Sequence, residues 1–201
     1  MITLDLGELS PAVLVIDMQV AFVSPDGAFG NDAADLIGRL NGFLDGCRSR
    51  GIPVVFCNYV LRADLRDAGL LTGNDAVQHF SDSSPGAAVD PRITRDGTDL
   101  DVRHNRPSAL FRSELEAVLG GLGVDALLLT GVSVNNAISS TAREAFARDI
   151  PALVVRDCVG ATPWEAEANH ETYFEILATW TAEVADARNV LTRLDARTGG
   201  T

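Results

Sequence analysis

The hydrophobic positions of this chain form short continuous runs that alternate with segments of helical periodicity. A run without polar alternation is typical of a strand buried on both faces, as in a parallel sheet. Such runs occupy 12–16, 53–57, 126–130 and 152–155. Helical patterns are found near 32–50, 112–121, 135–148 and 165–181, and a last strand near 183–186 and a terminal helix near 187–195 follow. This alternation predicts an α/β protein of three layers, a Rossmann-like sheet covered by helices on both faces.

One segment, 59–101, departs from this alternation, because Gly, Asp, Ser and Pro are dispersed through weak apolar patterning. Loops of this length inside compact domains are usually functional lids or subunit contacts. A length of 201 residues also lies within the usual size of one domain. We therefore expect a single domain over 1–201, in which 59–101 is a long insertion or lid and 197–201 is a frayed tail.

Composition excludes several classes of function. The net charge of −12 argues against nucleic acid as a partner, since such binding requires clustered cations. No apolar run approaches the roughly 20 residues of a membrane span, and the first residues lack a basic leader, so a cytoplasmic protein without membrane contact is expected. The three cysteines include no close pair, which fits a reduced compartment and predicts no metal site. All 16 basic residues are arginine, so no mechanism can use a lysine.

Polar side chains follow the apolar runs. In open parallel sheets, ligands bind beyond the carboxyl ends of the strands. Asp17 ends the first run, Tyr59 lies just past the second, His104 lies in the segment 102–108, and the segment 131–137 follows the run at 126–130. An acid at such a position can also simply cap the next turn, and a loop histidine is as often solvated as catalytic.

Three motifs in this order resemble the isochorismatase-like hydrolase family. The first is the strand end Asp-Met-Gln with Phe22 nearby, the second is 108–115 (SALFRSEL), and the third is 131–145 (GVSVNNAISSTAREA). The resemblance covers nearly the whole chain. It implies a six-stranded parallel sheet of order 3-2-1-4-5-6 and a cis peptide between Val132 and Ser133.

Transferred to this sequence, the family's catalytic residues give one match and two departures. Asp17 matches the catalytic aspartate, the family lysine falls on His104, and the family cysteine falls on Ala137. Amidase members attack a carbonyl with a thiolate, which a methyl group cannot replace. The resemblance therefore favours the branch of true isochorismatases, which lack the cysteine and cleave a vinyl ether. That branch retains the lysine and has Tyr-Ala-His where this chain has 133–135.

Vinyl-ether cleavage explains how Asp17 could catalyse a reaction without the cysteine and the lysine of the family. Protonation of the vinyl carbon creates an oxocarbenium ion that water captures, so the site requires a carboxylic acid that keeps its proton near neutral pH. Burial favours the protonated form, and His104, unlike lysine, can be neutral at that pH. Asp17 and His104 are therefore the expected catalytic residues.

The leading hypothesis is a cofactor-independent hydrolase that acts on a small, anionic metabolite. Arg106 is the best candidate to hold a substrate carboxylate, although most loop arginines are solvated surface charges. A catalytically silent relative that binds a metabolite or partner, and a biosynthetic enzyme that performs ring closure or dehydration, remain as alternatives. The residues expected to contact substrate are Gln19, Phe22, Tyr59, Arg106, Ser133, Asn136 and Ala137.

The long insertion and the resemblance, whose members bury substrate near subunit interfaces, together predict a homodimer or larger symmetric assembly. Light scattering at micromolar protein concentration should give at least twice the chain mass of 21.3 kDa. A mass of one chain would contradict this prediction.

Overall fold

The computed structural model describes residues 2–29, 32–161 and 167–196. Its strands form one parallel sheet of six in the order β3-β2-β1-β4-β5-β6, as predicted. The strands are β1 Pro11–Ile16, β2 Val54–Tyr59, β3 Leu100–His104, β4 Ala126–Val132, β5 Ala152–Gly160 and β6 Glu183–Ala185. The two neighbours of β1 in the sheet are β2 and β4, so the strand order reverses at β1. Sheets of this kind bind ligands at the carboxyl end of the strands beside such a reversal, which is where β1 ends.

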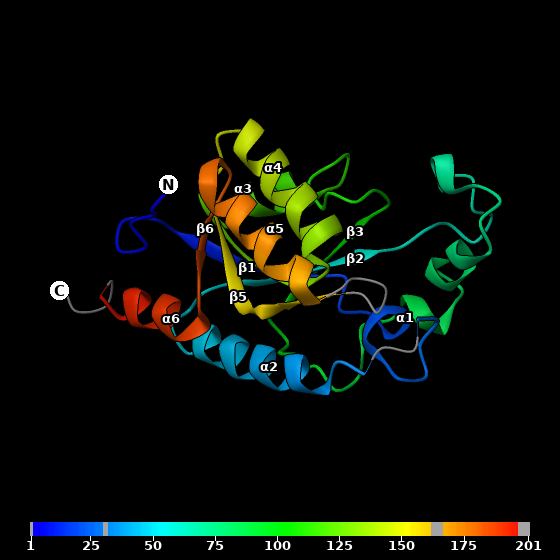
Figure 1. Cartoon of the computed structure of the whole chain (residues 1–201), viewed down its shortest axis with the longest axis horizontal. Helices are drawn as coiled ribbons and strands as arrows, with labels where there is room; N and C mark the ends of the chain where they lie inside the picture. The colour runs from blue at the N-terminus through cyan, green and yellow to red at the C-terminus, as the bar shows by residue number, and fades with distance from the viewer. Residues whose placement is uncertain (1, 30–31, 162–166, 197–201) are drawn as a thin grey trace.

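The helices cover both faces of the sheet (Figure 1). They are α1 Val20–Val23, α2 Ala34–Arg48, α3 Leu115–Gly121, α4 Ser139–Ala147, α5 Glu167–Trp180 and α6 Ala187–Asp195. Helices α2 and α6 pack on one face, and α3, α4 and α5 pack on the other. This arrangement confirms the three-layer prediction.

The predicted helix boundaries differ from the observed ones in two places. The helix expected at 112–121 begins only at Leu115, after a run of turns. The helix expected at 135–148 starts as one π turn, η4 Val134–Ile138, and continues as α4. The tail 197–201 lies outside the described residues. Within the described part of the chain, none of the helices is long and apolar enough to cross a membrane.

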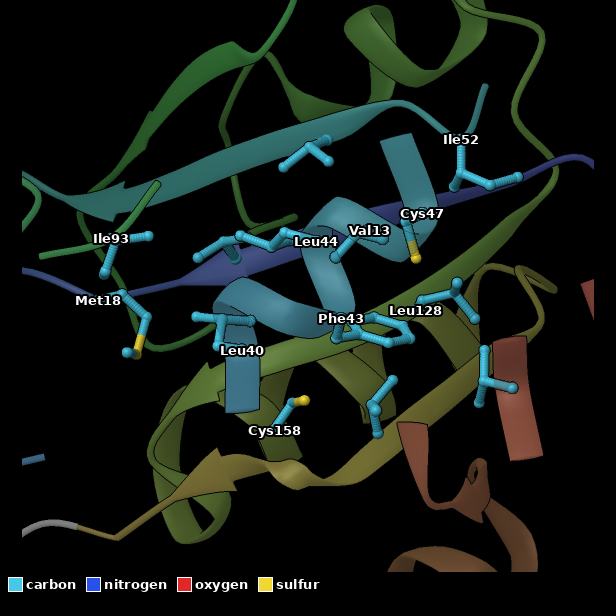
Figure 2. Packing of buried hydrophobic residues seen from close by; sticks show 14 of the residues in the cluster. Val13, Met18, Leu40, Phe43, Leu44, Cys47, Ile52, Ile93, Leu128 and Cys158 are labelled. Atoms are coloured by element: carbon cyan, nitrogen blue, oxygen red, sulfur yellow. The ribbon is translucent and has the colours of Figure 1, made fainter. Parts of the chain in front are cut away.

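The period of two along each strand divides the core between the two faces. Val13 and Val15 of β1 face α2, where Phe43 and Leu44 pack against them, as Figure 2 shows for Val13. Their neighbours along β1 belong to the cluster under α3, α4 and α5. Full burial of one such side chain stabilises the fold by about 1.5–3 kcal/mol. The polar end of β1 is therefore held on a rigid, two-sided core.

The insertion between β2 and β3 contains three short 3₁₀ helices, η1 Gly69–Leu71, η2 Asp75–Phe80 and η3 Pro85–Ala87. It extends from the side of the sheet opposite the two termini, next to α1 (Figure 1). Most of its buried apolar residues form a small third cluster with α1 and the end of β2, made of Ala21, Tyr59, Leu61, Ala68, Val77 and Phe80, while Ile93 joins the core under α2. The insertion is thus packed against the carboxyl end of the sheet near Asp17.

Gly131 allows β4 to lie close to β1 at this end. Its φ is +108°, and a Cβ atom would lie 2.0 Å from the carbonyl oxygen of Ile16. Only glycine tolerates both the conformation and the approach.

Replacing Gly131 by alanine should lower the free energy of unfolding by more than about 3 kcal/mol, because the clash adds to the backbone strain. Gly38 of α2 is the matched control, since nothing lies within 4 Å of its added Cβ. Gly38→Ala should raise stability by about 0.5–1 kcal/mol. Thermal unfolding followed by circular dichroism measures both variants, and equal melting temperatures would refute this account of the strand end.

Candidate active site

Asp17 occupies a sharp turn directly after β1. Its φ is +54°, in the left-handed region that aspartate adopts more readily than most residues. The side chain is 7% exposed. Its Oδ1 accepts a hydrogen bond from the backbone N–H of Tyr59 at 3.0 Å and lies 2.9 Å from Nε2 of His104. The turn therefore directs the carboxylate toward the ends of β2 and β3.

His104 is the last residue of β3 and is 3% exposed. Its Nδ1 lies 2.7 Å from the backbone carbonyl oxygen of Arg106. A carbonyl oxygen only accepts, so Nδ1 carries a hydrogen and donates it. The contact between Nε2 and Asp17 then requires a second proton, either on the ring nitrogen or on the carboxyl group. In both forms Asp17 and His104 together carry no net charge.

Two opposing effects act on the pKa of His104. Burial lowers it, but the Asp17 carboxylate and the carbonyls of Arg106 and Cys57 outweigh burial, so that the pKa lies above its ordinary value. His104 thus binds its second proton more tightly than an ordinary histidine does.

The side-chain amide of Gln19 forms hydrogen bonds with the backbone. Its Nε2 donates to the carbonyl of Tyr59 at 3.0 Å and to that of Ala87 at 2.7 Å, and its Oε1 accepts from the N–H of Tyr59 at 2.9 Å. Gln19 is fully buried. It therefore ties the insertion and β2 to the end of β1.

A cavity of about 300 Å³ opens beside Asp17. Among the residues that line it are three of the expected binding residues, Phe22, Tyr59 and Asn136. Its described lining also includes Phe29, Leu71, Asn74, Ala76, Val77, Phe80 and Pro107. The cavity is large enough for a small metabolite, and Asp17 is the acidic group at its wall.

The structure places three other expected binding residues away from this lining, as far as it is described. The guanidinium of Arg106 donates to the backbone carbonyls of Asp67 and Asn105. Ser133 donates from its hydroxyl to Asn135 at 2.6 Å, and Ala137 is buried in the core under α3, α4 and α5. The peptide between Val132 and Ser133 is cis, as predicted.

The three cysteines are buried. Burial raises the pKa of Cys47 to about 12, and it also raises the pKa values of Cys57 and Cys158. A thiol in this state is a poor nucleophile. In the described part of the chain, no group of three or more His, Cys, Asp or Glu side chains lies together in a way that could hold a metal ion.

Sequence reasoning missed most of the cavity wall. Phe29, Phe80 and Asn74 lie in segments without strand or helix periodicity. The segment 71–80 is no more apolar than the chain as a whole, so its composition gave no signal for this wall.

Comparison with known proteins extends these observations. The model of the isochorismatase domain family matches residues 11–189. The chain belongs to the isochorismatase family. Enterobactin synthase component B of Escherichia coli (strain K12) is 33% identical over 149 residues, 74% of this chain and 52% of that protein. N-carbamoylsarcosine amidase of Arthrobacter sp. is 25% identical over 156 residues, 75% of this chain and 59% of that protein.

The chain thus spans little more than half the length of these two relatives. A solved structure of a cysteine hydrolase from Pseudomonas syringae pv. phaseolicola 1448A superposes with a TM-score of 0.87 at 21% identity, covering 97% of this chain and 95% of that one. This likeness concerns the fold. Family membership supports the assignment of this chain as a hydrolase. The substrate and the mechanism have to be inferred from the geometry of the site.

The hydrogen-bond arrangement predicts the titration of His104. Its folded-state pKa should exceed the ordinary value of about 6.5, and Asp17→Asn should lower it, because the two largest effects that oppose burial are then lost and only the carbonyls of Arg106 and Cys57 remain. The stability that comes from charging His104 is complete below the unfolded-state pKa and is lost as pH rises through the higher folded-state pKa.

Carbon-13 NMR of the histidine rings measures this titration. Asp45→Asn, which removes an exposed carboxylate of α2, serves as the control and should leave the His104 titration unchanged. An unaltered His104 pKa in Asp17→Asn would contradict the coupling.

Proposed function

We propose that this chain hydrolyses an enol ether of a small metabolite by acid catalysis, without a cysteine nucleophile. The observation that carries the proposal is the pair of Asp17 and His104, which holds one shared proton at the wall of a cavity of about 300 Å³. An acid kept protonated near neutral pH is what protonation of a vinyl carbon requires.

The proposed reaction has two halves. First, Asp17 transfers the proton of the pair to the β-carbon of the enol ether, and the carbon attached to oxygen becomes an oxocarbenium ion beside the resulting carboxylate. Next, water adds to that cationic carbon and returns a proton to Asp17, which gives a hemiacetal. Collapse of the hemiacetal releases a carbonyl compound and an alcohol, and the pair regains its starting charge. His104 keeps its orientation throughout, since its Nδ1–H continues to donate to the backbone carbonyl of Arg106.

Ala137 and the buried thiols support the absence of a covalent step. The family's cysteine position carries a methyl group, and burial raises the pKa values of all three cysteines of this chain. A thioester route would lack an activated nucleophile.

An anionic substrate, which the sequence favoured, receives no support from Arg106. That guanidinium is bonded to two backbone carbonyls and does not belong to the described lining of the cavity.

Phenyl vinyl ether, a minimal enol ether, provides the test. Wild-type protein should hydrolyse it faster than buffer does. Asp17→Asn should lose more than the factor of about 10²–10⁴ that is typical of general acid catalysis, because the carboxylate also stabilises the cation. Cys47→Ala, Cys57→Ala and Cys158→Ala are the controls and should retain the rate.

Release of phenol, followed by its absorbance, measures each rate. Full activity of Asp17→Asn, or loss of activity in a folded cysteine variant, would eliminate the cysteine-free acid mechanism. A protein that binds ligands in the cavity but never accelerates hydrolysis would instead support a binding role.

A further inference from the structure

The cavity beside Asp17 carries no net charge on the side chains that are described around it. Its polar lining consists of Asp17, Tyr59, Asn74 and Asn136. Asp17 shares a proton with His104, so the pair is neutral as a unit. Burial raises the pKa of Tyr59, which keeps its phenol protonated. Among the described lining residues there is no arginine to balance an anion.

Arg106, which precedes the lining residue Pro107, is hydrogen-bonded to the insertion. Arg106 donates at 2.8 Å to the carbonyl of Asp67 and also to that of Asn105. Gly69, with a φ of +64°, lies so close that a Cβ atom there would approach the guanidinium to 2.7 Å. Arg106 therefore holds the insertion in place, and turning it toward the cavity would break these hydrogen bonds.

Other arginines gather elsewhere. Arg62, Arg103 and Arg112 line a separate cavity of about 210 Å³, together with Asp67 and Asp82. His104 borders that cavity, but Asp17 does not appear in its described lining. These three arginines thus line a different cavity from Asp17.

Aromatic rings form one wall of the cavity beside Asp17. Phe22 stacks on Phe29 with ring centroids 5.5 Å apart and on Phe80 at 4.7 Å, and Tyr59 meets Phe80 edge-on at 5.2 Å. Such a wall favours contact with flat, unsaturated groups. The phenylalanine rings offer no hydrogen bonds to a carboxylate, and none of the described lining residues brings a cation to balance one, so burying an anion there is costly. The net charge of −12 further disfavours the approach of anions.

We propose that the substrate presents an uncharged, flat, unsaturated group to this cavity and carries no carboxylate there. This inference rests on the proposed function, since the enol ether is the group that must reach Asp17. It gives the proposed reaction a substrate class: uncharged enol ethers attached to a planar ring or chain.

Two saturated ethers test the charge preference independently of turnover. Phenetole is uncharged, and 4-ethoxybenzoate is the same molecule with a carboxylate, and neither contains an enol ether that could be cleaved. NMR titration should show saturable binding of phenetole with shifts at Tyr59, at least tenfold tighter than binding of 4-ethoxybenzoate. Equal or tighter binding of the anion, or no saturable binding of phenetole, would overturn the inference.

A charge placed in the cavity should reverse the preference. Ala76 lines the cavity, so Ala76→Arg should bind 4-ethoxybenzoate more tightly than phenetole. Thr192→Arg adds the same charge on the exposed face of α6 and should keep the wild-type preference. If Thr192→Arg reversed it equally, net charge would govern binding and the inference would be wrong.

The two proposals can fail separately. Preference for phenetole without hydrolysis of phenyl vinyl ether would remove the acid mechanism and leave the charge selectivity in place. Hydrolysis of phenyl vinyl ether together with preferential binding of 4-ethoxybenzoate would support the acid mechanism and remove the charge selectivity.

Discussion

The hydrogen bond from Nδ1 of His104 to the carbonyl of Arg106 is the constraint on which the chemistry of the site depends. Because this ring nitrogen must donate, the opposite nitrogen can meet Asp17 only through a further proton. One backbone carbonyl thereby fixes the proton count of two side chains. It leaves the pair electrically neutral, able to give a proton to a substrate and to recover one from water.

The fold supplies the precision that this arrangement requires. Asp17 and His104 come from β1 and β3, which are separated by β2, and Tyr59 at the end of β2 donates its N–H to the carboxylate. Gln19 then joins the same strand end to Ala87 in the insertion. Because β1 is buried on both faces, the turn at Asp17 has a rigid support. The two packed cores thus fix the backbone that positions Asp17 and His104, and with them the shared proton.

Much of this architecture could be predicted from the sequence. The hydrophobic pattern predicted five of the six strands but not β3, whose residues are mostly exposed. The family motifs were sufficient for the strand order, the cis peptide at Val132 and the proximity of His104 to Asp17. The cavity wall could not be predicted, since Phe29 and Phe80 lie in irregular segments whose contacts depend on tertiary packing. The hydrogen bonds of Arg106 and Gln19 could not be predicted either, because the sequence does not reveal whether a polar side chain bonds to the backbone or faces a cavity.

The position of the shared proton is the central claim, and neutron diffraction from a deuterated crystal of the protein tests it most directly. The account predicts a deuterium on Nδ1 of His104 directed at the Arg106 carbonyl, and one further deuterium between Nε2 and Oδ1 of Asp17. A map in which either of these two positions is empty would contradict the neutral pair and the acid mechanism built on it.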